Sequence, residues 1–125
     1  MTKKEVLAKA ERIRAETEGL TLAKAASGAL IKWHAIKRGT RTVKSGLEKC
    51  DLCTLFWPTT DCKGCPLQEA GYGCLTDDSV WLRLEEVILQ DLPAYFFVEH
   101  LVACMYDQVY QACAPIILET AGQDV

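Results

Sequence analysis

The chain has 125 residues and half of them are hydrophobic, so it can bury one core and need not be disordered. No uncharged apolar run reaches the roughly 18 residues that a membrane span requires, and the first residues are typical of a helix start, not of a signal peptide. We therefore expect a cytoplasmic protein without a membrane partner. The net charge of −3 hides a division: residues 1–49 carry 12 Lys/Arg and 5 Asp/Glu, whereas residues 50–125 carry 2 and 12. The basic half and the acidic half could attract each other or serve different partners.

The basic half predicts two helices. Thr2 followed by Glu5 forms a capping box, and apolar residues then recur at helical spacing, which predicts a helix over about 2–18. A second apolar stripe predicts a helix over about 21–38. Gly28 interrupts this stripe at a cost of about 1 kcal/mol relative to alanine, which indicates close packing there.

The centre of the chain, about residues 50–76, holds five of the seven cysteines and two of the four prolines. Few of its residues favour a regular element, so we expect a loop that is organised by something other than backbone hydrogen bonds. After it, Asp78 or Ser79 caps a helix over about 79–91. Pro93 suits the first turn of a further helix over about 93–113, which Pro115 should end or kink. The predicted fold is mainly α: a single domain, 1–125, of four to five helices around a metal-stabilised cysteine loop.

The cysteines follow a regular pattern: Cys50-x2-Cys53, eight residues, Cys62-x2-Cys65, eight residues, Cys74. Two intervening residues let one tight turn aim both sulfurs at the same point, and two such turns supply four thiolates for a tetrahedral zinc ion. Gly64 can adopt the left-handed conformation that such a turn needs and leaves backbone N–H groups to face sulfur. The pattern predicts a structural zinc site, with no open coordination position for catalysis, formed by Cys50, Cys53, Cys62 and Cys65.

Other uses of the cysteines stay open. Cys74 or a histidine could replace one ligand, and Cys65-Pro66 is similar to the end of ferredoxin cluster-binding runs, which would make the cofactor an iron–sulfur cluster. Disulfides or unused thiols are a further alternative, although an odd number of cysteines cannot all pair internally. Cys104 and Cys113 lie on an apolar helix and are expected to be small buried residues.

Basic residues concentrate around the end of the second predicted helix. They could follow a phosphate backbone while a nearby tryptophan stacks on a base, or they could simply be a solvated helix end whose cations complement the helix dipole. His34 and His100 have no ligand spacing and are treated as ordinary helix residues. The candidate nucleic-acid-binding residues are Lys32, Trp33, Lys37, Arg38, Arg41 and Lys44.

The chain resembles a group of small proteins of tailed bacteriophages over about residues 20–76. The resemblance is carried by Lys32-Trp33, by Cys50-Asp51-Leu52-Cys53, by Asp61-Cys62-Lys63-Gly64-Cys65-Pro66-Leu67 and by Gly73-Cys74. It implies phage origin, a host bacterial cytoplasm as the location, and a metal-ligand role for the cysteines, but no activity. The group continues with a Thr-Pro-Tyr-like element where this chain has Thr76-Asp77-Asp78.

No glycine-rich phosphate loop, nucleophile elbow or metalloprotease helix is present in the sequence. We therefore expect no enzyme. The leading functional hypothesis is a zinc-stabilised, phage-type protein that binds a host protein, for example as an inhibitor of host defence or host machinery. The alternative is a nucleic-acid-binding regulator that uses the basic segment 32–49.

Overall fold

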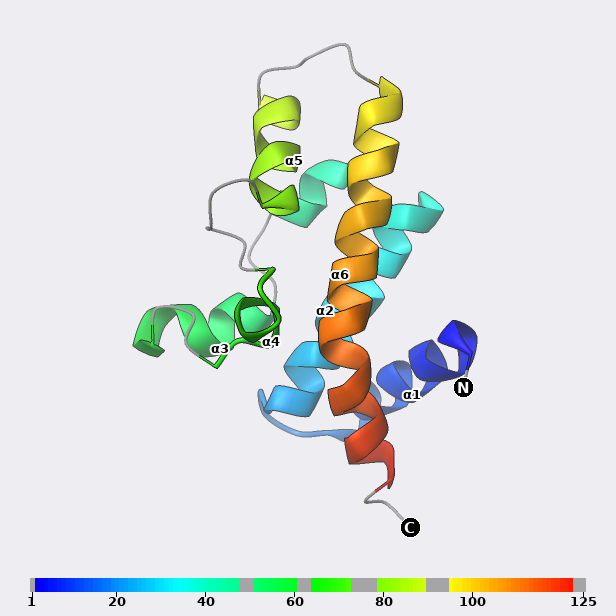
Figure 1. The fold of residues 1–125 in the computed structure, drawn as a ribbon. Coiled ribbons are helices and arrows are strands. Elements are labelled where there is room, and N and C mark those ends of the chain that lie inside the picture. Colours follow the sequence, from blue (N-terminus) through cyan, green and yellow to red (C-terminus); the bar gives the residue numbers. More distant parts are fainter. Residues whose placement is uncertain (1, 48–50, 61–63, 73–78, 90–94, 123–125) are drawn as a thin grey trace.

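The computed structural model describes residues 2–47, 51–60, 64–72, 79–89 and 95–122 (Figure 1). No strand occurs within these ranges, which confirms the prediction of a mainly helical fold. The elements in chain order are α1 (Lys3–Glu16), α2 (Leu22–Arg38), the 3-10 helix η1 (Val43–Leu47), α3 (Asp51–Thr60), α4 (Pro66–Glu69), α5 (Val80–Leu89) and α6 (Tyr95–Gly122).

Two helices form the centre of the molecule. α2 and α6 cross and make the most extensive contact, and α1 packs against both of them. α3 packs on α2, while α4 and α5 pack on α6, and η1 links α2 to α5. In Figure 1, α3 and α4 lie together on one side of α6, and α1 lies on the other.

The predicted start of α1 is confirmed. The Glu5 N–H donates to the Thr2 hydroxyl oxygen at 3.2 Å, and this hydroxyl donates to the Glu5 carboxylate at 3.2 Å. Val6, Ala10 and Ile13 then recur every three or four residues and are buried against the rest of the core. A helix of this length is marginal alone in water, so this buried stripe supplies most of its stability.

α2 is built for close approach. Thr21 caps it by accepting a hydrogen bond from the Lys24 N–H at 3.2 Å, and small side chains line its buried face. The carboxylate of Asp51, in the first turn of α3, lies where a side chain at Gly28 would begin. The predicted close packing at Gly28 is therefore confirmed: the missing side chain makes room for α3.

The middle of the chain differs from the predicted loop over 50–76. Residues 51–60 form α3, because Leu52, Leu55 and Phe56 place apolar side chains at i, i+3 and i+4, and Leu52 is fully buried. Asp51 also favours this helix, because an acidic residue in the first turn interacts well with the helix dipole. The proline and cysteine content of this stretch led to the prediction of a loop, whereas its apolar spacing forms a short amphipathic helix.

The last helix is longer than the predicted 93–113. α6 continues through Pro115 to Gly122. A proline inside a helix leaves the carbonyl four residues earlier, here that of Gln111, without its usual partner. Pro115 and Gln111 are both exposed, so water can satisfy that carbonyl, while Ile117 beyond the proline is fully buried. Burial of the following turn outweighs the lost bond. The predicted end near residue 113 was therefore wrong, whereas a kink at Pro115 stays a prediction.

The predicted cap of α5 at Ser79 is confirmed, and α5 also contacts η1. The Leu82 N–H donates to the Ser79 hydroxyl oxygen at 3.1 Å. The Trp81 indole N–H donates to the Gly46 carbonyl of η1 at 3.3 Å. A side chain added at Gly46 would meet the Trp33 ring at 2.8 Å, so η1 rests directly on the tryptophan of α2.

Candidate functional site

The cysteine segment is described in part. Cys53 is half-buried on α3, and Cys65 is buried immediately before α4. Cys50, Cys62 and Cys74 lie outside the described residues, so the four-cysteine zinc site stays a prediction. Among the residues that the structure does describe, no three His, Cys, Asp or Glu side chains gather as a metal-binding group.

The turn that carries Cys65 has a defined geometry. Gly64 adopts a φ of +87°, the left-handed conformation expected from the sequence. Its N–H is not left to face sulfur, however, because it donates to Oε1 of Glu69 at 3.1 Å. Pro66 follows at the first position of α4, where its missing N–H costs nothing. The turn is thus closed by its own hydrogen bonds.

The two cysteine-bearing elements approach each other. A side chain at Gly64 would meet the ring of Phe56 at 3.2 Å. Phe56 is one helical turn after Cys53, and Gly64 directly precedes Cys65. The fold therefore brings one member of each Cys-x2-Cys pair into neighbouring elements.

α4 is a single turn that ends in a Schellman motif. The Tyr72 N–H donates to the Leu67 carbonyl at 2.7 Å, and the Gly71 N–H donates to the Gln68 carbonyl at 3.1 Å. Gly71 has a φ of +86°, as this motif requires. Leu67 is buried and Tyr72 is partly buried against the core, so residues 64–72 are anchored at both ends.

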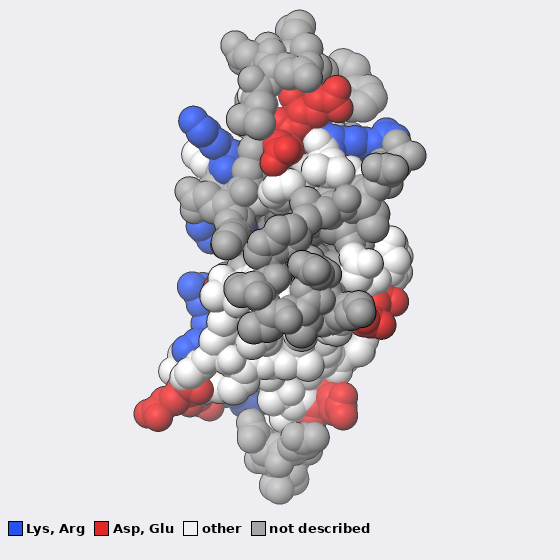
Figure 2. Space-filling model, turned by 90° about the vertical axis from the view of Figure 1, so that its left-hand side faces the viewer, with Lys and Arg blue, Asp and Glu red and all other residues white. Residues whose placement is uncertain are grey.

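The basic segment is divided by the fold. Trp33 is only 2% exposed and Lys32 only 7% exposed, so the Trp33 ring is not available to stack on a base. The Lys32 ammonium lies 5.9 Å from the centroid of the Trp33 ring. Exposed cations remain at the end of α2 and beyond it, namely Lys37, Arg38, Arg41 and Lys44. Figure 2 shows the side that carries α3, α4 and α5, where basic side chains lie mostly along the edges.

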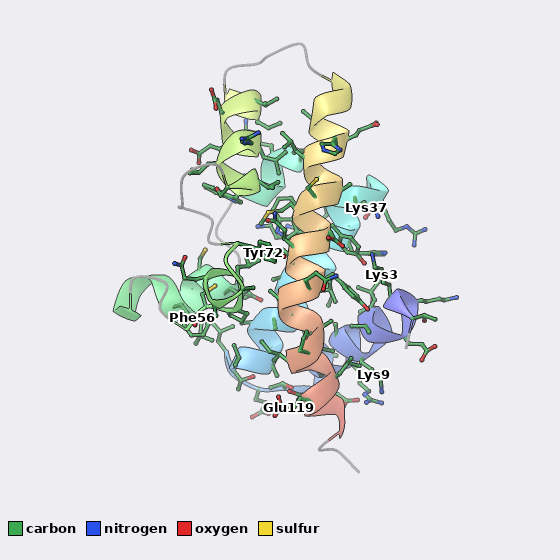
Figure 3. All side chains as sticks on the ribbon, viewed as in Figure 1. Lys3, Lys9, Lys37, Phe56, Tyr72 and Glu119 are labelled. Atoms are coloured by element: carbon green, nitrogen blue, oxygen red, sulfur yellow. The ribbon has the colours of Figure 1, made fainter. Side chains whose placement is uncertain are left out.

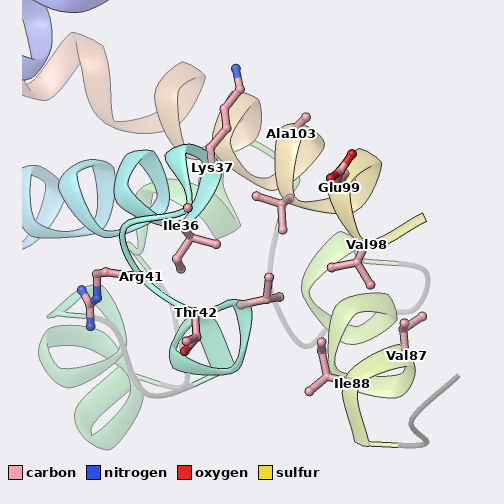
Figure 4. A pocket seen from close by; sticks show the side chains of 12 residues that line it. Ile36, Lys37, Arg41, Thr42, Val87, Ile88, Val98, Glu99 and Ala103 are labelled. Carbon is pink, nitrogen blue, oxygen red and sulfur yellow. The ribbon is translucent and has the colours of Figure 1, made fainter. Parts of the chain in front are cut away.

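An open groove of about 710 Å³ lies between the end of α2, η1, α5 and the first turns of α6 (Figure 4). Its floor is aliphatic, and Lys37, Arg41 and Glu99 stand at its rim. No local sequence pattern predicts this groove, because its walls come from four elements that are distant in the chain. It lies next to the exposed basic residues, and its volume is in the range of small-molecule sites.

Cations and aromatic rings meet where α1, α2 and α6 join (Figure 3). The Lys37 ammonium lies 4.9 Å from the Tyr106 ring centroid, and the Lys3 ammonium lies 5.5 Å from it and 5.1 Å from that of Tyr110. Burial, followed by the nearby Tyr110, raises the pKa of Tyr106. Burial first, then the charges of Arg38 and Lys37, lowers the pKa of His34, against an opposing effect of Glu11. This cluster ties α1 to the helix pair.

One pairing was missed from the sequence. His100 and Cys104 were treated separately, yet they are four residues apart and share one face of α6, with Nε2 and Sγ 3.7 Å apart. The i, i+4 spacing was the signal that could have found it. Cys113 is fully buried, as expected, whereas Cys104 is partly exposed.

Comparison with known proteins finds no matching family model, no matching curated protein and no matching solved structure. Within the described ranges, one stretch, Val98–Thr120 of α6, is long and apolar enough to cross a membrane by length and composition, with a mean hydropathy of 1.3. In this fold 44% of it is buried inside the protein, and core helices of soluble proteins meet the same criterion.

Proposed function

We propose that the chain is a zinc-stabilised, non-enzymatic, phage-type protein that binds a host protein and thereby inhibits host machinery. The metal has a structural role in this proposal, and the binding surface is formed by the helices. The observation that carries it is the approach of the two cysteine-bearing elements through Phe56 and Gly64. Four thiolates from two such elements would suit a tetrahedral zinc ion with no open position.

The cysteine segment, residues 51–72, buries too few side chains to be held in place by packing alone. Among its described residues, only Leu52, Cys65, Pro66 and Leu67 are buried. Its two helices, α3 and α4, have 10 and 4 residues, too short to be stable alone in water. A structural zinc ion supplies an apparent binding free energy of about 10–16 kcal/mol in zinc-finger peptides. Such a contribution would hold this segment against α2 and α6.

Metal content tests this part directly. We expect about one zinc ion per purified chain by mass spectrometry and loss of zinc in Cys53→Ser and Cys65→Ser. Cys104→Ser is the matched control, because Cys104 is partly exposed on α6 and outside the cysteine segment; it should keep its zinc. Equal zinc in all three variants, or a visible absorption that bleaches on reduction, would contradict a zinc site, and the second result would favour iron–sulfur.

The binding role is tested by capture from a bacterial lysate. We expect a defined protein to be retained by the zinc-loaded chain and lost with Arg38→Glu or another charge reversal at the end of α2. Nuclease treatment should not release it. The proposal of a protein partner would lose its support if the wild-type chain captured no protein, or if the charge-reversal variants captured the same proteins as the wild type.

Nucleic-acid binding is the second candidate, favoured by the four exposed cations between residues 37 and 44. A gel shift at low salt tests it, since phosphate contacts weaken steeply as salt rises. Because Trp33 is buried, any such binding should be independent of base sequence and should not involve that ring.

A further inference from the structure

The groove between α2, η1, α5 and α6 has an aliphatic floor. Ile36 and Val102 are buried at its base, with 4% and 5% exposure, and partly exposed side chains complete it, namely Val43, Val87, Ile88 and Val98. A volume of about 710 Å³ falls within the roughly 300–1,000 Å³ of small-molecule sites. An aliphatic surface of this size favours a ligand with an apolar body.

Arg41 supplies an exposed cation at the edge of this floor, with its side chain extending outward from the aliphatic residues in Figure 4. Arg41 is exposed, and within the described residues its guanidinium makes no ion pair. Its backbone position is fixed, because the Arg41 N–H donates to the Ala35 carbonyl at 3.3 Å. The Lys37 stem also lines the groove, but its ammonium lies over the Tyr106 ring on α6.

The end of α2 does not cancel this charge. Helix carbonyls carry partial negative charge at a C-terminus. Here the Ala35 carbonyl accepts from the Thr40 N–H at 3.0 Å and the Ile36 carbonyl accepts from the Gly39 N–H at 3.1 Å. Two of the last four carbonyls of α2 are therefore already paired with the chain's own donors.

The opposite charges of Arg41 and Glu99 would orient a charged ligand in the groove. In Figure 4, Arg41 and Glu99 stand on opposite sides of the aliphatic side chains. An anionic group would be attracted to the Arg41 side and repelled from the Glu99 side. The apolar part of the same molecule would then lie over the floor, toward α5 and α6.

We propose that this groove binds a free, single-chain amphiphile with an aliphatic body and one anionic head, such as a medium-chain carboxylate, with the head at Arg41. This activity goes beyond the proposed host-protein binding and does not depend on the zinc site. It rests on the aliphatic floor, on Arg41, which makes no ion pair with the residues that the structure describes, and on the opposing Glu99.

Calorimetry with two probes of equal chain length tests it, with dodecanoate and dodecyltrimethylammonium both below the concentration at which they aggregate. We expect one dodecanoate per chain, bound at least about tenfold more tightly than the cation, a difference of about 1.4 kcal/mol. Arg41→Glu should reverse that order, while Lys44→Glu, an equal charge change outside the groove lining, should preserve it.

Two further variants locate the site. Ala103→Phe fills the groove from α6 and should abolish binding, whereas Ala8→Phe, on the exposed face of α1, should not. Glu99→Gln should tighten dodecanoate binding by about two- to fivefold, the value of one exposed charge pair. Arg41→Glu changes only an exposed side chain, so it keeps the test valid if Ala103→Phe does not fold.

Three results would overturn the proposal: equal affinity for the two probes, dodecanoate binding unchanged by both Arg41→Glu and Ala103→Phe, or binding only to anionic phospholipid vesicles. The last would assign the surface to a membrane instead of a free amphiphile. Each of these results leaves the zinc content and the captured host protein unaffected, so failure here is separate from failure of the proposed function.

Discussion

The core of α1, α2 and α6 and the cysteine segment of residues 51–72 are held together in different ways. In the core, the three helices bury one another through long apolar stripes. α1 and α2 are capped by threonine side chains, and α2 ends at a glycine. In the cysteine segment, two short helices are fixed by a turn, a Schellman motif and a few buried side chains. The first region owes its order to area buried, and the second depends on a small number of specific local contacts.

Metal removal should separate the two regions most strongly. With a chelator, we expect residues 64–72 to lose amide protection, while α1 and α2 stay protected, because only the first group depends on the proposed zinc ion. The loss corresponds to an apparent stabilisation of about 10–16 kcal/mol in comparable zinc sites. Hydrogen exchange by mass spectrometry measures it peptide by peptide. If residues 64–72 kept their amide protection after confirmed zinc loss, the proposed difference between the core and the cysteine segment would be contradicted.

Two matched leucines test where each region's stability lies. Leu30 on α2 and Leu52 on α3 are both fully buried. Leu30→Ala should lower the free energy of unfolding by about 2–5 kcal/mol with or without zinc. Leu52→Ala should cost a comparable amount in the zinc-bound protein and nearly nothing after chelation, since α3 would then already be detached. Urea unfolding in both metal states measures this, and equal behaviour of the two variants would argue against separate regions.

The junction between the regions lies at Gly28 and Asp51. Gly28→Ala should lower the free energy of unfolding by about 1 kcal/mol, the usual centre for a destabilising mutation, because the new methyl group meets the Asp51 carboxylate. In an Asp51→Ala background the same change should instead stabilise by up to about 1 kcal/mol, through helix propensity. A double-mutant cycle in urea gives both values, and additive effects would contradict direct contact.

Ser27 tests the core alone. Its hydroxyl is fully buried, and no described residue forms a hydrogen bond with it. Ser27→Ala should therefore raise the free energy of unfolding by about 1 kcal/mol, because an unsatisfied buried polar group is costly. Thr120→Ala is the control, since that hydroxyl donates to the Ile116 carbonyl at 2.9 Å and its removal should bring no comparable gain.

The smallest expected effect concerns pH. The pKa of His34 is lowered in the folded chain from its ordinary 6.5, chiefly by burial. The unfolded chain therefore binds a proton more readily, so the stability due to neutral His34 is complete above pH 6.5 and is lost as the pH falls through the folded pKa. His34→Gln should show a smaller loss of stability between pH 8 and pH 5 than the wild type. Identical losses in thermal melts would contradict this assignment.

The sequence predicted the core better than the cysteine segment for a physical reason. α1, α2 and α5 are each set by a cap and an apolar period within one stretch of chain, and all three were located within about two residues. α3 has the same kind of period over only Leu52, Leu55 and Phe56, which is too short to stand out beside cysteines and prolines. The predicted end of α6 near residue 113 left out its last turns because burial of Ile117 depends on tertiary packing.

The candidate sites follow the same division. Local spacing predicted the left-handed Gly64 but could not say which group its N–H would bind. Burial of Trp33 under η1 is set by Gly46 and by Trp81, residues that lie 13 and 48 positions farther along the chain. The groove is wholly non-local, since its lining runs from Ile36 to Ala103. Surfaces assembled from distant segments leave no short pattern in a sequence.

The exposed position of Pro115 has a mechanical consequence for α6. A proline ring pushes the helix axis away from itself, and the missing rung lies on the solvent side. The last turns are therefore expected to lean inward, toward the core that buries Ile117. Straightening this helix with alanine would release that inward lean and loosen its C-terminal turns, even though alanine is the better helix former.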